Sequence, residues 1–180
     1  MTASDFVTAS SEFENVLISE NYKIDKNKIK KITPGVDKEV FSPNSSIKRE
    51  NIFLSIGRIQ PQKGQVETLK FLSNFRKVES DFKCYFIGGP SGKSGNEYLD
   101  ELKKNIKDLD LDSHVEFLDN LSQTKIKELL NKSKLLIHTS KFETFGLVAI
   151  EANSMGVPVL TTNKGSLVEI IENDKNGFFS

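Results

Sequence analysis

The chain contains one cysteine, no tryptophan and no excess of either charge. Cys84 alone cannot form an internal disulfide, and the apolar run 84–87 around it indicates a buried small side chain rather than a nucleophile. Because 25 Lys and Arg residues balance 25 Asp and Glu residues, the composition does not favour nucleic acid as a partner. No zinc-type grouping of Cys and His surrounds the two histidines, so we expect no metal site.

Long apolar runs are also missing. No segment approaches the ~18 consecutive apolar residues of a membrane span, and the N-terminus lacks the charged-then-apolar pattern of a signal peptide. We therefore expect a cytoplasmic protein without a transmembrane segment. Peripheral association of a longer, full-length chain with membranes is compatible with this expectation. With 180 residues and 37% hydrophobic content, the chain can form one domain with a buried core plus a flank.

Short apolar runs alternate with helical patterns in the larger part of the chain. The runs predict strands at residues 52–56, 84–87, 115–118, 135–137, 157–160 and 177–179. Between them apolar residues recur at helical spacing, and short helices are expected at 146–155 and 168–172. Near-continuous apolar strands with helical crossovers predict a doubly wound, Rossmann-like α/β domain whose parallel sheet is covered on both faces. Ligands of such domains lie outside the carboxyl ends of the strands.

The first 46 residues follow a different pattern. We expect a short strand at 6–9, a helix capped by Ser10 or Ser11, and a strand at 29–33. A polar stretch at 42–46 follows them. This segment is too small to hold a core alone. We therefore divide the chain into a flank, residues 1–46, and a domain, residues 47–180.

Two cations lie in the loop after the first strand of the domain. The loop has the sequence Gly-Arg-Ile-Gln-Pro-Gln-Lys-Gly over residues 57–64, so that Arg58 and Lys63 follow Gly57 at the carboxyl edge of the sheet. A planar guanidinium and a mobile ammonium suit a diphosphate, because they neutralise the charge that grows as a phosphate leaves. Two solvated surface cations are the alternative, since exposed Lys and Arg are common.

Two carboxylates bracket the predicted start of the helix after the fourth strand. Glu143 precedes the helix and Glu151 lies within its first two turns. The amides of Phe145, Gly146 and Leu147 would be unpaired at the helix N-terminus and suited to phosphate. The alternative is that Glu143 is a loop residue and Glu151 a solvated helix position.

A glycine-rich segment at residues 88–95 ends like a phosphate-binding P-loop. Its spacing differs from that motif, because Gly88 and Gly92 enclose three residues instead of four and Pro90 lacks a backbone donor. We expect a mobile loop near the ligand cleft instead. His114 and His138 are interpreted as ordinary strand-end residues.

Together these motifs resemble the C-terminal, nucleotide-sugar-binding lobe of retaining GT-B glycosyltransferases of group 1 (family 4). The family's Glu-x7-Glu signature is matched by Glu143 and Glu151, and its diphosphate loop by residues 57–64. Residues 32–37 are similar to its interlobe connection, and residues 8–10 to the end of its acceptor lobe. The motifs occur in the family's order over nearly the whole chain.

The resemblance implies a role for each site residue. Arg58 and Lys63 would bind the donor diphosphate, Glu143 a sugar hydroxyl and Glu151 the ribose hydroxyls. Glu143, Arg58 and Lys63 would contribute to catalysis. The donor site would be completed by the backbone of Gly57, Phe145, Gly146 and Leu147.

The resemblance also implies an activity, that of a hexosyltransferase acting without cofactor or metal on a nucleotide-diphosphate sugar. The acceptor, a sugar or a lipid-linked sugar, would be held by a lobe encoded before residue 1. Residues 1–46 would then end the acceptor lobe and connect the lobes, residues 47–180 would form a donor domain incomplete at its C-terminus, and the isolated fragment would be inactive.

Three positions depart from the family's pattern. They are Asp119 and Ser166, where the family has glycine, and Val168, where it often has proline. The alternative function is a non-catalytic module of the same fold that binds a nucleotide or another phosphorylated ligand. A dehydrogenase is disfavoured, because no Gly-x-Gly-x-x-Gly follows the first strand.

Overall fold

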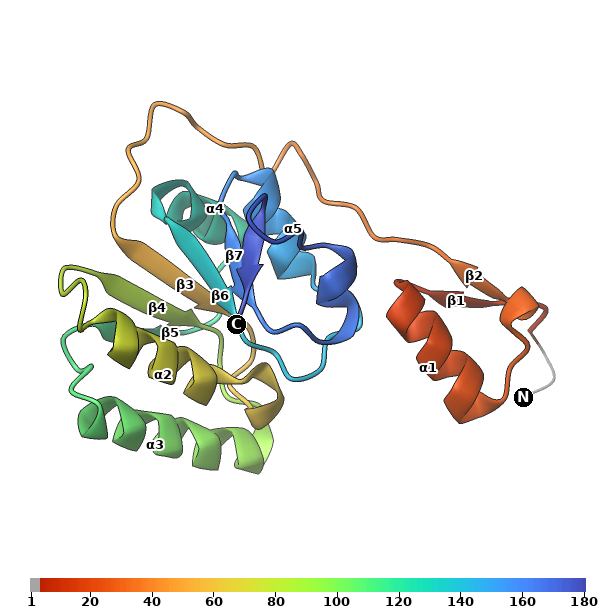
Figure 1. The fold of residues 1–180 in the computed structure, drawn as a ribbon, viewed down its shortest axis with the longest axis horizontal. Helices are drawn as coiled ribbons and strands as arrows, with labels where there is room; N and C mark the ends of the chain where they lie inside the picture. Colours follow the sequence, from red (N-terminus) through yellow and green to blue (C-terminus); the bar gives the residue numbers. More distant parts are fainter. Residues whose placement is uncertain (1–3) are drawn as a thin grey trace.

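Six parallel strands form the main sheet, as the computed structural model of residues 4–180 shows (Figure 1). The strand order is β5-β4-β3-β6-β7-β8, which reverses direction between β3 and β6. The bounds are β3 Ile52–Ile56, β4 Lys83–Ile87, β5 Val115–Leu118, β6 Leu135–His138, β7 Val159–Thr161 and β8 Gly177–Phe179. This order confirms the predicted doubly wound, Rossmann-like fold and places its switch point between β3 and β6.

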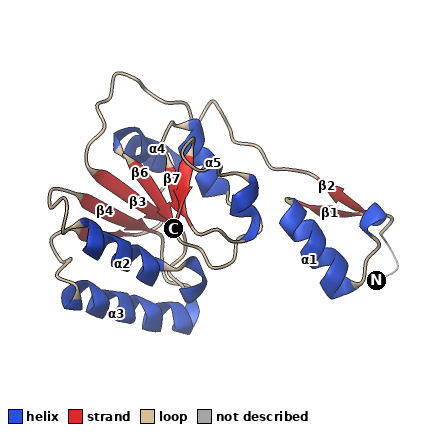
Figure 2. Cartoon of the chain, viewed as in Figure 1, coloured by secondary structure: helices blue, strands red, loops and turns tan. Residues whose placement is uncertain are grey.

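Helices cover both faces of this sheet (Figure 2). One face carries α2 (Gln65–Phe75) and α3 (Gly92–Asp108), and the other carries α4 (Gln123–Lys132) and α5 (Leu147–Ser154). Neighbouring residues of β3 enter different cores: Phe53 joins the one beneath α2 and α3, whereas Leu54 packs under α4 and α5. Because side chains alternate across a strand, burial of both faces explains the continuous apolar runs.

Several elements differ from the predicted bounds: β2 (Ile29–Lys31) ends at Lys31 instead of residue 33, β7 is Val159–Thr161 instead of 157–160, and two helical segments begin earlier than predicted. Helix α3 begins at Gly92, so the glycine-rich loop ends earlier than residue 95. Gly95 lies in the first turn and packs closely beneath the loop after β3, since an added Cβ would be 3.0 Å from the Ile59 carbonyl oxygen. The predicted short helix at 168–172 is a 3₁₀ helix, η3, at Gly165–Glu169. It begins early because the Ser166 amide donates to the Glu143 carbonyl (3.1 Å).

The N-terminal segment forms a small unit of its own. Strands β1 (Val7–Ala9) and β2 (Ile29–Lys31) pair in parallel, and α1 (Glu12–Tyr22) and the 3₁₀ helix η1 (Lys26–Lys28) connect them. Ser11 is the N-cap of α1, which confirms one of the two predicted caps.

The connection between β2 and β3 packs against the larger domain. Phe41 is buried in the same core as α4 and α5. The Arg49 guanidinium donates to the carbonyls of Ser133 (2.6 Å) and Met155 (2.7 Å), which are the C-caps of those two helices. Arg49 thus satisfies carbonyls that helix ends leave unpaired. The domain boundary after residue 46 stays a prediction.

Candidate functional site

The loops that follow β3 and β6 meet at the switch point of the sheet. There a cleft of about 220 Å³ is lined by Gly57 after β3, His138 at the end of β6, the side chains of Lys63 and Glu143, and the start of α5. Because parallel strands all end at this edge, residues from distant parts of the chain share one small volume.

Lys63 and Glu143 form an ion pair within this cleft. Lys63 ends the 3₁₀ helix η2 (Pro61–Lys63), and its Nζ lies 2.7 Å from Glu143 Oε2. The two side chains are only 22% and 16% exposed, so salt screens their attraction less than that of a surface pair. Gly57 lies against the Lys63 alkyl chain, since an added Cβ would be 3.7 Å from Lys63 Cδ. The predicted cation and carboxylate are therefore brought together.

His138 ends β6, as predicted, and it also contacts Glu143, a contact that its interpretation as an ordinary strand-end residue did not include. Its Nε2 lies 3.1 Å from Glu143 Oε2, and the side chain is 5% exposed. Burial raises the pKa of Glu143, but hydrogen bonds from His138 and Lys63 and the charge of Lys63 outweigh it and lower that pKa to about 2. Glu143 is thus ionised at neutral pH. The position of His138 at the end of a strand next to the switch point was the available signal in the sequence.

The first amides of α5 point to an anion-binding role for the backbone. Gly146 is the N-cap with a left-handed φ of 92°, and an added Cβ would lie 2.7 Å from Leu167 Cδ2. Within residues 4–180, the amides of Phe145, Gly146 and Leu147 donate no hydrogen bond to the backbone. All three residues line the cleft. Unpaired amides and the partial positive charge of a helix N-terminus favour a phosphate group here.

Arg58 lies in an adjoining hollow. This hollow, of about 390 Å³, shares Lys63, Glu143 and Thr144 with the cleft and is otherwise lined by Arg58, Gln60, Gln62 and Phe142. Arg58 is exposed and has no acidic partner among the described residues. The guanidinium is therefore placed beside the Lys63–Glu143 pair and free to meet an anionic ligand that extends from the cleft.

Glu151 does not join the cleft directly. It lies four residues after Leu147 and so on the same face of α5, but it lines neither hollow. Burial raises the pKa of its carboxyl group. Its side chain forms no ion pair within the described part of the chain. The structure thus separates the two glutamates, with Glu143 in the cleft and Glu151 a turn further along the helix.

A larger hollow, of about 620 Å³, lies at the opposite edge of the sheet. Four cations line it, and three of them, Arg49, Lys83 and Lys134, have hydrogen-bond partners within the protein. Lys134 Nζ donates to Asn51 Oδ1 (2.6 Å), and Arg49 is held by the carbonyls described above. This hollow lies at the amino ends of the strands, where loops do not converge as they do at the switch point. Residues 4–180 contain no cluster of three or more His, Cys, Asp or Glu side chains suited to a metal ion.

A family model described as glycosyl transferases group 1 matches residues 37–180. The chain belongs to this family. It is 31% identical over 185 residues to the D-inositol 3-phosphate glycosyltransferase of Rhodococcus jostii (strain RHA1), covering 97% of this chain and 41% of that protein. It is 25% identical to the mannosylfructose-phosphate synthase of Agrobacterium fabrum, with 98% and 41% covered. The chain thus spans about 41% of the length of these curated relatives.

Solved structures of glycosyltransferases share the fold of this group 1 chain. The Anabaena protein Alr3699/HepE, in complex with UDP and glucose, aligns with a TM-score of 0.87 at 23% identity, over 98% of this chain and 49% of that one. A glycosyltransferase from Rickettsia africae ESF-5 aligns at 0.80 and 28% identity, over 97% and 48%. The C-terminal domain of LpcC, a group 1 family protein from Francisella tularensis, aligns at 0.72 and 26%, over 81% and 80%. The chain therefore has the architecture of a GT-B C-terminal lobe.

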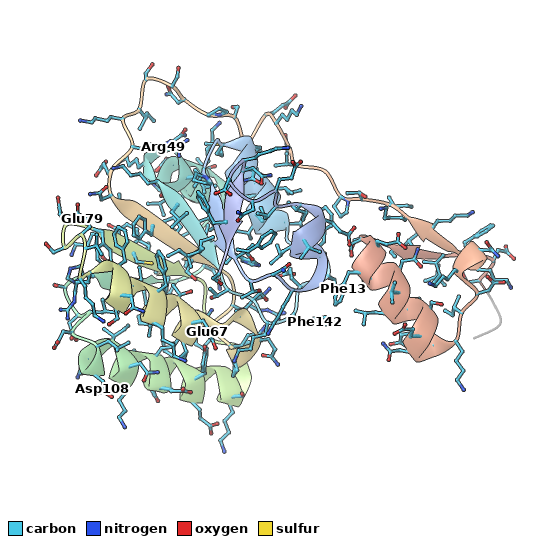
Figure 3. All side chains as sticks on the ribbon, viewed as in Figure 1. Phe13, Arg49, Glu67, Glu79, Asp108 and Phe142 are labelled. Carbon is cyan, nitrogen blue, oxygen red and sulfur yellow. The ribbon has the colours of Figure 1, made fainter. Side chains whose placement is uncertain are left out.

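In this group 1 chain the N-terminal helix contacts the loop that carries Glu143. Ser11 Oγ donates to the carbonyl of Thr144 (2.6 Å) and also accepts from the amide of its own helix. The ring of Phe13 meets the ring of Phe142 edge-on with centroids 5.6 Å apart, where α1 approaches the loop (Figure 3). The sequence pattern predicts Ser10 or Ser11 as the cap, but it gives no sign of this second contact, because the partner lies 133 residues away.

A carboxylate from the larger domain binds the start of the same helix. The two oxygens of Glu169 accept from the amides of Glu12 (3.0 Å) and Phe13 (2.9 Å). These are amides that a helix N-terminus leaves unpaired, and a negative charge there is stabilising. In this glycosyltransferase family member, α1 is thus held by η3 as well as by the loop bearing Glu143.

Proposed function

We propose that this chain is the donor-binding part of a glycosyltransferase and that it binds a nucleotide-diphosphate sugar in the cleft between β3 and β6. The observation that best supports this function is the convergence of Lys63, Glu143 and the unpaired amides of residues 145–147 at the switch point. An ammonium group and a helix N-terminus suit a diphosphate, and a carboxylate suits a sugar hydroxyl. The Anabaena HepE structures, which contain UDP or UDP-glucose, agree with this proposal.

Each residue of the site has a role in this function. Lys63 and Arg58 bind the diphosphate, which requires the Lys63 ammonium to turn from Glu143 towards phosphate oxygens. Glu143 is ionised, so it only accepts hydrogen bonds and selects a hydroxyl donor on the sugar. The half-buried Glu151 accepts hydrogen bonds from the ribose, and Gly57 leaves room for the ligand beside Lys63.

The reaction is the transfer of a hexose to an acceptor with retention of configuration. The bond from the anomeric carbon to the diphosphate breaks, and the bond to the acceptor oxygen forms on the same face. The acceptor proton passes to the leaving phosphate, while Arg58 and Lys63 stabilise the charge that grows there. No metal or cofactor takes part. Residues 1–46 end the acceptor lobe, so the chain alone binds donor but transfers nothing.

We place the acceptor, a sugar or a lipid-linked sugar, on the preceding lobe, and the full-length protein in the cytoplasm with peripheral access to membranes. None of the helices in residues 4–180 combines the length and apolar character that crossing a bilayer requires. Nucleic acid is not a partner in this proposal.

Calorimetric titration with UDP, GDP and ADP tests donor binding. The Lys63→Ala/Glu151→Ala variant is expected to bind the preferred diphosphate at least tenfold more weakly, because a hydrogen bond to a charged group contributes about 1.5–3 kcal/mol. The matched control is Lys125→Ala/Glu128→Ala, which removes an exposed Lys–Glu pair from α4. Equal affinity of the wild type and the site variant contradicts the proposal.

Transfer itself is measured with the full-length protein. Incubation with UDP-glucose or GDP-mannose and a panel of sugar and lipid-linked acceptors is expected to release the nucleoside diphosphate and a glycoside with the donor's anomeric configuration. Binding of the diphosphate without transfer by the full-length protein favours the non-catalytic binding module instead.

A further inference from the structure

We propose that His138 is a positioning residue for the donor sugar. It holds the Glu143 carboxylate by one oxygen and leaves the other oxygen to face the ligand. This inference rests on the proposed function, because Glu143 acts on a sugar only if the cleft takes a nucleotide sugar. His138 does not touch the reacting atoms in this scheme and works through Glu143.

The two donors that contact Glu143 share a single oxygen. His138 Nε2 lies 3.1 Å and Lys63 Nζ 2.7 Å from Oε2. Within residues 4–180, Oε1 forms no hydrogen bond or ion pair. The carboxylate is thus fixed at one oxygen and has free acceptor capacity at the other, beside the cleft that it lines.

The charge of Glu143 determines which nitrogen of the His138 imidazole must carry a hydrogen. Glu143 is ionised, because the hydrogen bonds and charge around it lower its pKa to about 2. A carboxylate accepts hydrogen bonds and donates none, so the 3.1 Å contact requires a hydrogen on His138 Nε2. His138 therefore presents a donor to Glu143 in either its neutral Nε2–H form or its cationic form.

His138 is more deeply buried than Lys63. It ends β6, pairs with Thr161 of β7, and its carbonyl accepts a hydrogen bond from Thr161 Oγ1 (2.8 Å). Its side chain is 5% exposed, so it lacks room to turn away. Lys63 has a long flexible side chain, and its ammonium is the group that moves to the diphosphate. After that movement His138 is the donor that remains on Oε2.

The alternative is a purely structural role, in which a buried histidine is satisfied by a neighbouring acid. The two roles differ in what they affect. A structural residue supports the whole cleft, so its loss weakens diphosphate and sugar binding together. A positioning residue for Glu143 affects the sugar, because the diphosphate is bound by other groups.

The test compares His138→Leu and His138→Gln with the wild type, using calorimetry with UDP and UDP-glucose and with GDP and GDP-mannose. In His138→Leu we expect the affinity for the preferred nucleotide sugar to fall about tenfold, while the affinity for its diphosphate changes less than about twofold. Gln keeps an N–H donor at the end of its side chain, so His138→Gln is expected to recover most of the loss. The matched control is His114→Leu, whose imidazole bonds to the Ser80 carbonyl elsewhere in the fold.

Two results overturn this inference: equal loss of diphosphate and sugar affinity, or no loss of either in His138→Leu. If the wild type binds neither these four ligands nor ADP, the proposed function itself is wrong and the inference falls with it. If His138→Leu does not fold, ¹⁵N NMR of the wild type decides instead. A neutral imidazole with its proton on Nδ1 contradicts the proposal, whereas a proton on Nε2 supports it.

Discussion

Ser11 and Thr144 are joined by a hydrogen bond of 2.6 Å from the serine hydroxyl to the threonine carbonyl. Thr144 lies between Glu143 and Phe145, so this bond connects the N-terminal unit to the backbone that lines the cleft at the switch point. The orientation of the N-terminal unit and the geometry of the cleft are therefore linked through one side chain.

Replacing Ser11 tests this link against a matched serine. Ser11→Ala loses both the cap of α1 and the bond to Thr144, whereas Ser122→Ala loses only the cap of α4. Since a cap and a further hydrogen bond each contribute about 1 kcal/mol, Ser11→Ala is expected to lower the free energy of unfolding by about 1 kcal/mol more. Urea denaturation measures this difference. Equal losses in the two variants contradict the link.

Removing the Glu169 carboxylate is expected to release α1 from the larger domain. Glu169→Ala leaves the amides of Glu12 and Phe13 without their acceptors, and the N-terminal unit loses a charge-assisted contact. Limited trypsin digestion is then expected to cut the connection at Lys38 at least about threefold faster, which corresponds to a loss of about 0.7 kcal/mol. Glu172→Ala is the control, because Glu172 pairs only with exposed Lys175. Unchanged cleavage in Glu169→Ala contradicts the expectation.

The free energy of unfolding is expected to depend on pH through the titration of Glu143. Its folded pKa of about 2 lies below the ordinary value of 4.5, so its ionised form stabilises the fold above pH 4.5, and this contribution is lost as the pH falls towards 2. The pH-dependent advantage of the wild type over Glu143→Gln is expected to be on the order of 3 kcal/mol at neutral pH and to vanish near pH 2. Denaturant titrations between pH 2 and 7 measure it.

The opposite sign is expected for Glu151. Burial raises its folded pKa, so the protonated form is favoured in the fold and its contribution is lost as the pH rises through that raised value. In the same denaturant titrations, the free energy of unfolding of the wild type is therefore expected to fall relative to that of Glu151→Gln as the pH rises. Parallel curves for the two glutamate variants contradict the opposite signs of the two pKa shifts.

Substitution at two glycines distinguishes the energetic cost of a strained backbone from the cost of a steric clash. Gly64 and Gly92 both have left-handed backbones, with φ values of 68° and 65°. An added Cβ meets nothing within 4 Å at Gly92, but would lie 2.0 Å from the Thr139 carbonyl oxygen at Gly64. Gly92→Ala is expected to lower the free energy of unfolding by about 1 kcal/mol, and Gly64→Ala by about 3 kcal/mol or more. Similar losses in thermal or urea unfolding contradict the close approach of Gly64 to Thr139.

The strands of the main sheet were predictable because their burial is visible in the sequence. Residues 52–56 are apolar in near succession, and the structure buries Phe53 and Leu54 on opposite faces of β3. Element ends were less predictable. Gly95 in the first turn of α3 packs against the Ile59 carbonyl, and the Ser166 amide of η3 donates to the Glu143 carbonyl, so both helix starts contact distant segments.

In the cleft, too, some features were predictable from the sequence and others were not. Placing Lys63 and Glu143 at one edge of the sheet required only the rule that parallel strands end together. The contact of His138 with the same carboxylate oxygen was not predictable, because its Nε2 meets Oε2 through the fold of the intervening loop. Arg58 is closer in the sequence to the end of β3 than Lys63 is, yet Arg58 lines only the adjoining hollow, whereas Lys63 lines the cleft as well.

The alternation of strands and helices, and the loops in which charged residues occur, follow from local sequence, because burial periodicity and backbone preferences act over a few neighbouring residues. Which of those charged and polar residues contact the same carboxylate oxygen depends on how distant segments pack together. Hydrogen bonds depend on distances near 3 Å, and these are set when segments tens of residues apart, such as those of Lys63, His138 and Glu143, pack against the same sheet edge.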